Sequence, residues 1–245
     1  MKNLVYYAFD ESYLECFKHN LKLLRKYNPE IHVCCITPVD FGLDVESFIC
    51  PEFDPFYTAK YSIVKWKSFH HYDNFLYLDS DAFAIKPLSN IFDTINSNKD
   101  VIHGVRERFS INEKDRIMPK FFRLFEKQCV EGPAFNAGTF GFNKNQKLAL
   151  EDLLKYIERF KRFKGIKSSE QPFFNEFLAC DKNLLTPTLS KYVHLYGIQR
   201  RNMWSEINLI NLEESSIVHI AGCYRSEGIA DKKVEKMLEV LNQFI

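Results

Sequence analysis

The sequence lacks three features that would narrow its function quickly: a long hydrophobic run, a glycine-rich phosphate loop and an excess of charge of one sign. No stretch reaches the roughly 18 apolar residues of a membrane-spanning helix, so no transmembrane segment is predicted. The 33 basic and 32 acidic side chains give a formal net charge of +1. Because so small a charge attracts neither nucleic acid nor an anionic membrane, a local site must define the partner.

Cysteine pairs with the spacing of a zinc site are also absent. The seven cysteines are odd in number and lie in apolar stretches such as the one around Cys34 and Cys35. We therefore expect buried free thiols in a reducing compartment and a cytoplasmic location. The N-terminal apolar run ends at Asp10, which makes it too short for a secretory signal.

The order of predicted elements favours an α/β protein. Residues 4–9 and 31–37 read as apolar strands, and 14–24 between them have helical spacing behind a capping box of Ser12 and Glu15. This βαβ unit predicts a parallel sheet with a right-handed crossover. Further strands are expected at 46–50, 74–78, 101–105, 135–142 and 216–221, and helices at 58–70, at 146–163, from 168 onward and at 231–244. No repeat or linker divides the chain, so residues 1–245 are expected to form one domain.

The apolar strand at 74–78 leads directly into Asp79-Ser80-Asp81. Ligands of α/β sheets bind beyond the carboxyl ends of strands, and carboxylates at i and i+2 of an extended chain point to one side. Both can then reach one divalent ion, and hard oxygen ligands suit magnesium or manganese. The alternative is an acidic loop that simply faces water, which is common for isolated Asp-x-Asp strings.

Other metal and phosphate sites fit this segment poorly. An EF-hand loop needs glycine at its sixth position and glutamate at its twelfth, where this chain has Ala84 and Asn90. A haloacid-dehalogenase-like phosphatase would carry a second aspartate two residues after Asp10, which is absent here. No P-loop and no Gly-x-Gly-x-x-Gly string occurs.

Several short motifs follow one another in a recognisable order. They are AFD with nearby Tyr13, Lys60 ahead of YDNFLYLDSDAFAIKPL, then FNAGTFGF, SSEQPFFNEF and HIAGCYR. Together they resemble the glycogenin-like retaining glycosyltransferases, family 8 and its relatives. The resemblance implies a GT-A fold with a single, mostly parallel central sheet flanked by helices. It further implies a nucleotide-binding half at 1–105 and an acceptor and sugar half at 106–245.

The same resemblance implies a metal centre for Mn²⁺ or Mg²⁺. Asp79 and Asp81 would bind the ion, with His219 as the third ligand; on its own, a histidine there would more often be a core or strand-end residue. Gly222 would admit the donor diphosphate closely, and Arg225 stands where the family has a lysine. A guanidinium can still bind phosphate with two hydrogen bonds.

The remaining site residues also come from the resemblance. Asn136 would meet the donor sugar, although a strand with a bulge is the alternative for this segment, and Glu170-Gln171 would lie beside the sugar hydroxyls and anomeric carbon, or else cap a helix. Lys60 would contact phosphates or sugar, with Lys65 as an alternative. The residues assigned to the donor nucleotide and sugar are Ala8, Phe9, Asp10, Tyr13, Ser80, Ala137 and Gly138.

The resemblance thus predicts transfer of a hexose from a UDP-sugar with retention, by a front-face substitution in which Gln171 positions the sugar. The acceptor is open among glycan, protein and lipid, and a homodimer is one alternative for the oligomeric state. Competing functions are a sugar-phosphate nucleotidyltransferase, whose glycine-rich N-terminal loop is missing from AFDESY, and a non-catalytic sugar-nucleotide-binding protein. The intact Asp79, Asp81, Gln171 and His219 argue against the latter.

Overall fold

The computed structural model describes residues 1–50, 52–54, 58–110, 133–161, 170–199, 203–206, 215–221, 239 and 242. The predicted βαβ unit opens the chain as β1 (Asn3–Ala8), α1 (Leu14–Tyr27) and β2 (His32–Thr37), with β1 and β2 parallel. The helix ends just before Asn28-Pro29, as expected, because proline disfavours a helical residue before it.

A seven-stranded central sheet is built on this unit in the order β3-β2-β1-β4-β7-β6-β8. Its other strands are β3 (Glu46–Ile49), β4 (Asn74–Leu78), β6 (Ile102–Ser110), β7 (Pro133–Asn143) and β8 (Leu185–Thr186). Strands β3, β2, β1 and β4 run parallel to one another, and β6 runs parallel to β8, whereas β7 runs antiparallel to both of its neighbours, β4 and β6. The predicted mostly parallel α/β sheet is therefore confirmed.

A second sheet of four strands was not expected from the sequence. Its order is β10 (Met203–Glu206), β9 (Val193–Gln199), β11 (Ile217–Ala221) and β5 (Ala82–Ala84). The three residues of β5 carry no strand signal of their own, and their partner β11 lies far away in the sequence. This pairing places His219 opposite Ala82, directly after the Asp79-Ser80-Asp81 segment.

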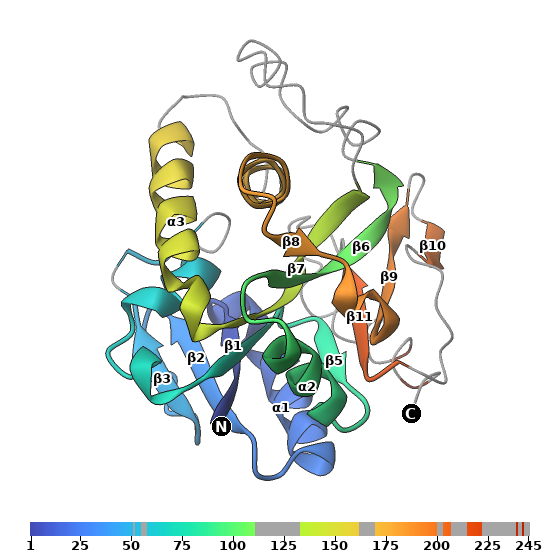
Figure 1. Ribbon diagram of the computed structural model, residues 1–245. Coiled ribbons are helices and arrows are strands. Elements are labelled where there is room, and N and C mark those ends of the chain that lie inside the picture. Colours follow the sequence, from blue (N-terminus) through green and yellow to red (C-terminus); the bar gives the residue numbers. More distant parts are fainter. Residues whose placement is uncertain are drawn as a thin grey trace.

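Two apolar cores lie on the two faces of the central sheet, as the alternation within β1 shows. Leu4 and Tyr6 belong to one core, while Val5 and Tyr7 belong to the other. Helices α1 and α2 (Ser89–Ser97) pack on the second core, and α3 (Lys147–Lys161) packs on the first, so the helices flank the sheet (Figure 1). The polar groups of the site lie where strands of this layered core end.

Two local expectations were wrong. Residues 58–70 form two 3-10 turns, Ala59–Lys65 and Phe69–His71, with extended backbone at Trp66 between them. Ile63, Trp66 and Phe69 recur every three residues, which is the period of a 3-10 helix. The capping box is absent too: Asp10 accepts a hydrogen bond from the backbone N–H of Ser12 at 3.0 Å, and α1 starts without a side-chain cap.

The cysteine expectation holds for only part of the chain. Cys16, Cys34, Cys35 and Cys50 are buried free thiols, but Cys180 forms a disulfide bond. Sequence spacing could not reveal this, because a disulfide depends on which cysteines meet in space.

The helix expected from residue 168 is present, with Pro172 in its first turn, as α4 (Gln171–Phe174) followed by a π-helix at Asn175–Asp181. The serines expected to cap it, Gly222 and Arg225 lie outside the described residues, as does the terminal helix expected at 231–244 apart from residues 239 and 242. Within the described part of the chain, no helix combines the length and hydrophobicity needed to cross a membrane.

Candidate active site

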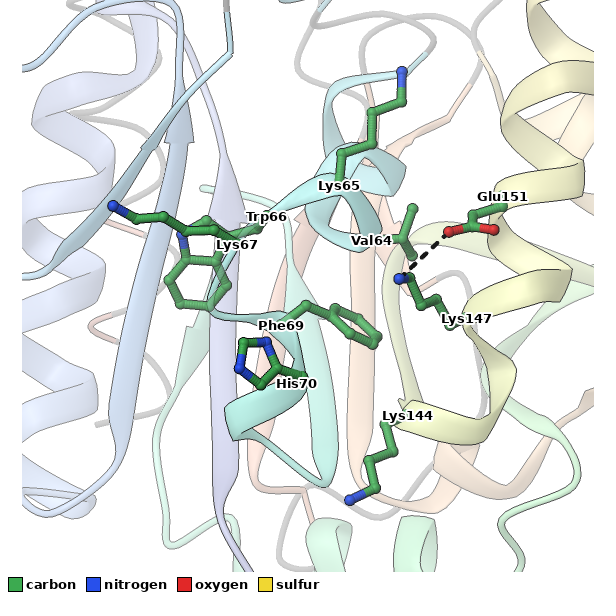
Figure 2. A pocket seen from close by; sticks show the side chains of 9 residues that line it. All are labelled: Val64, Lys65, Trp66, Lys67, Phe69, His70, Lys144, Lys147 and Glu151. Carbon is green, nitrogen blue, oxygen red and sulfur yellow. Dashed lines mark ion pairs between the residues drawn. The ribbon is translucent and has the colours of Figure 1, made fainter.

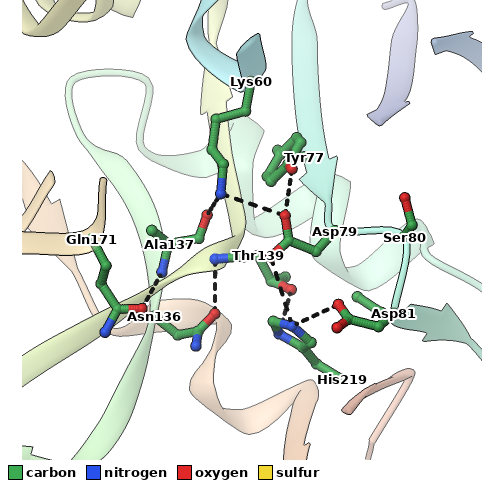
Figure 3. Close-up of polar contacts among 12 residues, drawn as sticks. Lys60, Tyr77, Asp79, Ser80, Asp81, Asn136, Ala137, Thr139, Gln171 and His219 are labelled. Atoms are coloured by element: carbon green, nitrogen blue, oxygen red, sulfur yellow. Dashed lines mark hydrogen bonds and ion pairs between the residues drawn. The ribbon is translucent and has the colours of Figure 1, made fainter. Parts of the chain in front are cut away.

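Three potential metal ligands meet where β4, β5 and β11 adjoin (Figure 3). Asp79 follows β4, Asp81 precedes β5, and His219 comes from β11. Their ligand atoms all lie within 4.8 Å of one another. His219 Nε2 is 3.2 Å from Asp81 Oδ1 and 3.9 Å from Asp79 Oδ2. Two carboxylates and an imidazole at this separation can surround one divalent cation.

The turn that carries the aspartates is held from behind by α1. The fully buried Asn20 donates its amide N–H to the carbonyl of Ala82 at 2.5 Å, and the Cys16 thiol donates to the carbonyl of Ser80 at 2.8 Å. The hydroxyl of Tyr7 donates to Asn20 Oδ1 at 3.1 Å and fixes the orientation of that amide. These contacts keep the backbone of the turn rigid, although no sequence motif pointed to them.

Gly138 is required by close approach to the ligands. A Cβ atom there would lie 2.3 Å from Asp79 Oδ2 and 2.3 Å from His219 Cε1. The register of β6 against β7 shifts at this point, because Gly104 pairs with Phe140 but Val105 pairs with Asn136. The bulge that was the structural alternative for this segment is thus real, and it lies beside the ligands, as bulges near active sites often do.

Lys60 is a buried cation that links both parts of the site. Its ammonium donates to Glu170 Oε1 at 2.6 Å, to the Ala137 carbonyl at 2.9 Å and to Asp79 Oδ1 at 3.4 Å. Burial lowers the pKa of Lys60, but Asp79 and Glu170 more than offset this, so the pKa is raised and Lys60 stays charged. Burial raises the pKa of Glu170, which the charge of Lys60 opposes.

The two lysines that the sequence left open lie in different surroundings. Lys65 lies away from the ligands and faces Glu158 on the surface, with 3.9 Å between Nζ and Oε1. Lys60 therefore occupies the site. The Glu170 carboxylate forms the ion pair with Lys60. The N–H of Phe174 in α4 donates to the backbone carbonyl of Glu170 at 3.0 Å and not to its side chain.

Two amides from different elements share one buried carboxylate. Asn136 Nδ2 and Gln171 Nε2 donate to Glu107 Oε1 at 3.2 Å and 3.0 Å. The amide oxygens accept backbone N–H groups, Gln171 Oε1 from Ala137 at 3.3 Å and Asn136 Oδ1 from Gly138 at 2.8 Å. Sequence reasoning missed Glu107, which sits in β6 among other charged residues and follows no motif.

Tyr77 and Thr139 were missed as well, although both touch predicted ligands. The Tyr77 hydroxyl donates to Asp79 Oδ1, and Thr139 Oγ1 lies 3.4 Å from His219 Nδ1. Burial, followed by the charge of Asp79, raises the pKa of Tyr77 well above its ordinary value, so this phenol keeps its proton. The signal for Tyr77 was available, because residues two apart on a strand share a face.

The residues predicted to receive the nucleotide lie at the end of β1, whose neighbour β4 is parallel and ends at Leu78, directly before Asp79. Phe9 is a core residue, since its ring stacks on Phe17 with 4.6 Å between centroids. Asp10 caps the turn that precedes α1. The Ser80 hydroxyl is buried and has no hydrogen-bond partner among the described residues.

A separate pocket of about 650 Å³ lies at the other end of β4 (Figure 2). Its lining includes Lys65, Lys67, Lys144 and Lys147, together with Trp66. These side chains come from the segment before β4 and the start of α3, so the pocket is remote from the metal ligands. The Trp66 ring is almost fully buried, which leaves little aromatic surface for a ligand.

Comparison with known proteins supports the arrangement described above. The model of the family "Glycosyl transferase family 8" matches residues 55–224, which include all three candidate metal ligands. Galactinol synthase 6 from Arabidopsis thaliana is 24% identical over 177 residues, which is 67% of this chain and 48% of that protein. The chain therefore spans about half the length of this curated relative.

Solved glycosyltransferases share the fold at low sequence identity. The galactosyltransferase LgtC, solved with donor and acceptor sugar analogs, superposes with a TM-score of 0.60 at 12% identity, covering 98% of this chain and 95% of that one. GlyE from Streptococcus pneumoniae gives a TM-score of 0.58 at 18% identity over 100% of this chain and 63% of its own. The expected GT-A fold is thus confirmed.

Proposed function

Because the chain belongs to glycosyl transferase family 8, we propose that it transfers a hexose from a UDP-sugar to an acceptor hydroxyl with the help of Mn²⁺ or Mg²⁺. The observation that carries this proposal is the cluster of Asp79, Asp81 and His219 at the carboxyl end of β4. Parallel sheets bind their ligands at this edge, because strand ends there supply polar loops above an apolar core.

The ligand set fits a divalent cation. Oxygen from two carboxylates and nitrogen from one imidazole suit Mn²⁺ or Mg²⁺. The missing side chain of Gly138 lets Asp79 Oδ2 and His219 approach β7 closely, since a Cβ atom there would lie 2.3 Å from each. When bound, such a cation acts as a Lewis acid that stabilises negative charge on a departing diphosphate.

The other residues of the site then have distinct tasks. Lys60 supplies a buried positive charge beside Asp79 and Glu170, and Asn136 and Gln171 present fixed amides to the sugar. Donors and acceptors held in advance lower the reorganisation needed during reaction. Ala8, Asp10, Tyr13 and the Ser80 hydroxyl, which has no partner within the described part of the chain, would meet the nucleoside. Gly222 and Arg225 would meet the diphosphate.

Retention is proposed from the resemblance, and the way the acidic side chains are used favours a front-face route to it over a double displacement. A double displacement needs a carboxylate that is free to attack the anomeric carbon. Glu170 is paired with Lys60, and Glu107 accepts hydrogen bonds from two amides, so neither is presented as a nucleophile. We therefore propose a front-face substitution, with Gln171 positioning the sugar and the leaving phosphate accepting the proton of the acceptor hydroxyl.

Some parts of the proposal rest on the resemblance alone. Residues 1–105 would form the nucleotide-binding half of one domain, and 106–245 the half that binds sugar and acceptor. A cytoplasmic location and a homodimer stay predictions. A galactinol synthase and a galactosyltransferase are among the similar proteins, which makes UDP-galactose the first donor to test. The acceptor class is left to experiment.

The proposal is tested with a panel of UDP-sugars and Mn²⁺, measuring thermal shift and sugar release. We expect one UDP-sugar to stabilise the protein and to be consumed. The double substitution Asp79→Asn with Asp81→Asn should slow transfer about a thousandfold or more, since a metal stabilises the transition state by several kcal/mol. Full activity in the double variant would refute the metal assignment, and an inverted anomer in proton NMR would refute retention. A nucleotidyltransferase would instead convert the UDP-sugar and added pyrophosphate to UTP and sugar 1-phosphate, and a non-catalytic protein would bind without turnover.

A further inference from the structure

Within the metal site proposed above, on which this inference rests, we propose that Tyr77 is a positioning residue that makes Asp79 bind the cation through Oδ2 alone. The hydroxyl of Tyr77 holds Oδ1 of the same carboxylate. Nothing in the sequence motif assigns a role to this tyrosine, since the motif is recognised by its two aspartates.

The strand itself creates the contact. Tyr77 and Asp79 are two residues apart at the end of β4, so both side chains project to the same side of the strand. The phenol ring is buried in the apolar core and lies 5.2 Å from the ring of Phe140, which leaves it little freedom to move. Figure 3 shows the hydroxyl above the carboxylate of Asp79, on the side away from His219.

A second donor reaches the same oxygen. Lys60 Nζ lies 3.4 Å from Asp79 Oδ1 and 4.8 Å from the centroid of the Tyr77 ring. A carboxylate oxygen has two lone pairs, and these two donors occupy both. The ammonium and the phenol therefore hold one oxygen of Asp79 and determine the rotation of its carboxylate.

The other oxygen is directed at the cation site. Asp79 Oδ2 is the atom that lies 3.9 Å from His219 Nε2, and it is also the atom that a Cβ on Gly138 would strike. Without the phenol, the Asp79 carboxylate could rotate and form its contacts in other ways. Binding the cation would then cost this rotational freedom and lower the metal affinity. Groups that hold metal ligands by hydrogen bonds typically change metal affinity by about tenfold to a hundredfold when removed.

Tyr6 offers a matched control. It is a buried tyrosine on the neighbouring strand, its ring lies 5.1 Å from that of Tyr77, and its hydroxyl has no partner among the described residues. Replacing Tyr6→Phe and Tyr77→Phe removes the same atom from the same core. Only the second substitution removes a hydrogen bond to a metal ligand.

The experiment measures binding of Mn²⁺ alone by electron paramagnetic resonance, together with unfolding of each variant in EDTA. We expect wild type and Tyr6→Phe to bind Mn²⁺ equally, Tyr77→Phe to bind at least about tenfold more weakly, and Asp81→Asn to lose binding. In turnover assays, excess Mn²⁺ should restore most of the activity of Tyr77→Phe, which a general loss of folding would not allow.

Each failure has a distinct meaning. If Tyr77→Phe binds Mn²⁺ as tightly as Tyr6→Phe does, the positioning role is wrong while the metal site stands. If Asp81→Asn binds Mn²⁺ as wild type does, or if wild type binds none, the proposed metal site is wrong and the role of Tyr77 falls with it. Unfolding in EDTA identifies any variant whose weaker binding merely reflects a damaged core.

Discussion

The two ends of β4 carry ion pairs of similar length in opposite surroundings. At the metal end, Lys60 Nζ lies 2.6 Å from Glu170 Oε1, with side chains only 6% and 11% exposed. At the other end, Lys144 Nζ lies 2.8 Å from Asp73 Oδ1, with exposures of 47% and 31%. Water screens the second pair and scarcely reaches the first, so distance alone says little about what each pair contributes.

The comparison extends to what each end can do. At the buried end, acidic groups surround one lysine. The lysine holds these groups in place for a cation, but the loss of any partner would strongly destabilise the fold. The lysines around the open pocket mostly face nearby carboxylates in solvent, as Lys147 does with Glu151 at 3.6 Å (Figure 2). We therefore expect substitutions at the metal end to have large effects on stability and chemistry, and those at the pocket end to have small ones.

The largest expected effect comes from Lys60→Met. This change leaves Glu170 and Asp79 buried without their cation, and breaking a buried pair typically costs about 3–5 kcal/mol. The free energy of unfolding, measured in urea without metal at neutral pH, should fall by that order. The loss should shrink at acidic pH, because Glu170 can then be protonated, in keeping with its raised pKa. A cost no greater than that of Lys144→Met would mean that the burial of this pair has no energetic consequence.

An intermediate effect is expected from Gly138→Ala. The new methyl group would meet Asp79 Oδ2 and the His219 ring, so Mn²⁺ affinity and transfer should fall together, with about 1–3 kcal/mol of destabilisation. Gly141→Ala on the same strand is the control, because its methyl would meet the flexible Ile95 side chain at 2.4 Å, far from the ligands. Equal loss of Mn²⁺ binding in both variants would show that strand distortion, and not contact with the ligands, is responsible.

The smallest effect is expected at the exposed end. The hydrogen bond from Lys144 lowers the pKa of Asp73 below its ordinary value of 3.8, so the pair stabilises the fold above that pH and the stabilisation is lost as the pH falls through the lowered value. Lys144→Met should cost at most about 1 kcal/mol at neutral pH. Unfolding curves of wild type and variant should converge in strong acid. A difference that persists there would have to come from packing of the lysine stem.

Local sequence signals predicted a large part of the molecule. The strand Asn74–Leu78 was predicted to the residue, because the apolar run at 75–78 ends abruptly at an aspartate. The helix α3 followed from its apolar spacing, and its buried residues Leu150, Leu153 and Ile157 confirm that spacing. The 58–70 segment failed because a three-residue apolar period fits a 3-10 turn as well as one face of an α-helix.

The sequence by itself determined the Asp79 and Asp81 pair, since both the end of an apolar strand and the i and i+2 spacing are local properties. Only the tertiary structure decided what surrounds that pair. The pairing of β11 with β5 brings His219 to the aspartates, and burial brings Lys60 and Glu107 among groups distant in the chain. The physical reason is that an isolated charge is expensive to bury, so buried charges find partners, and those partners are chosen by the fold and not by neighbours in sequence.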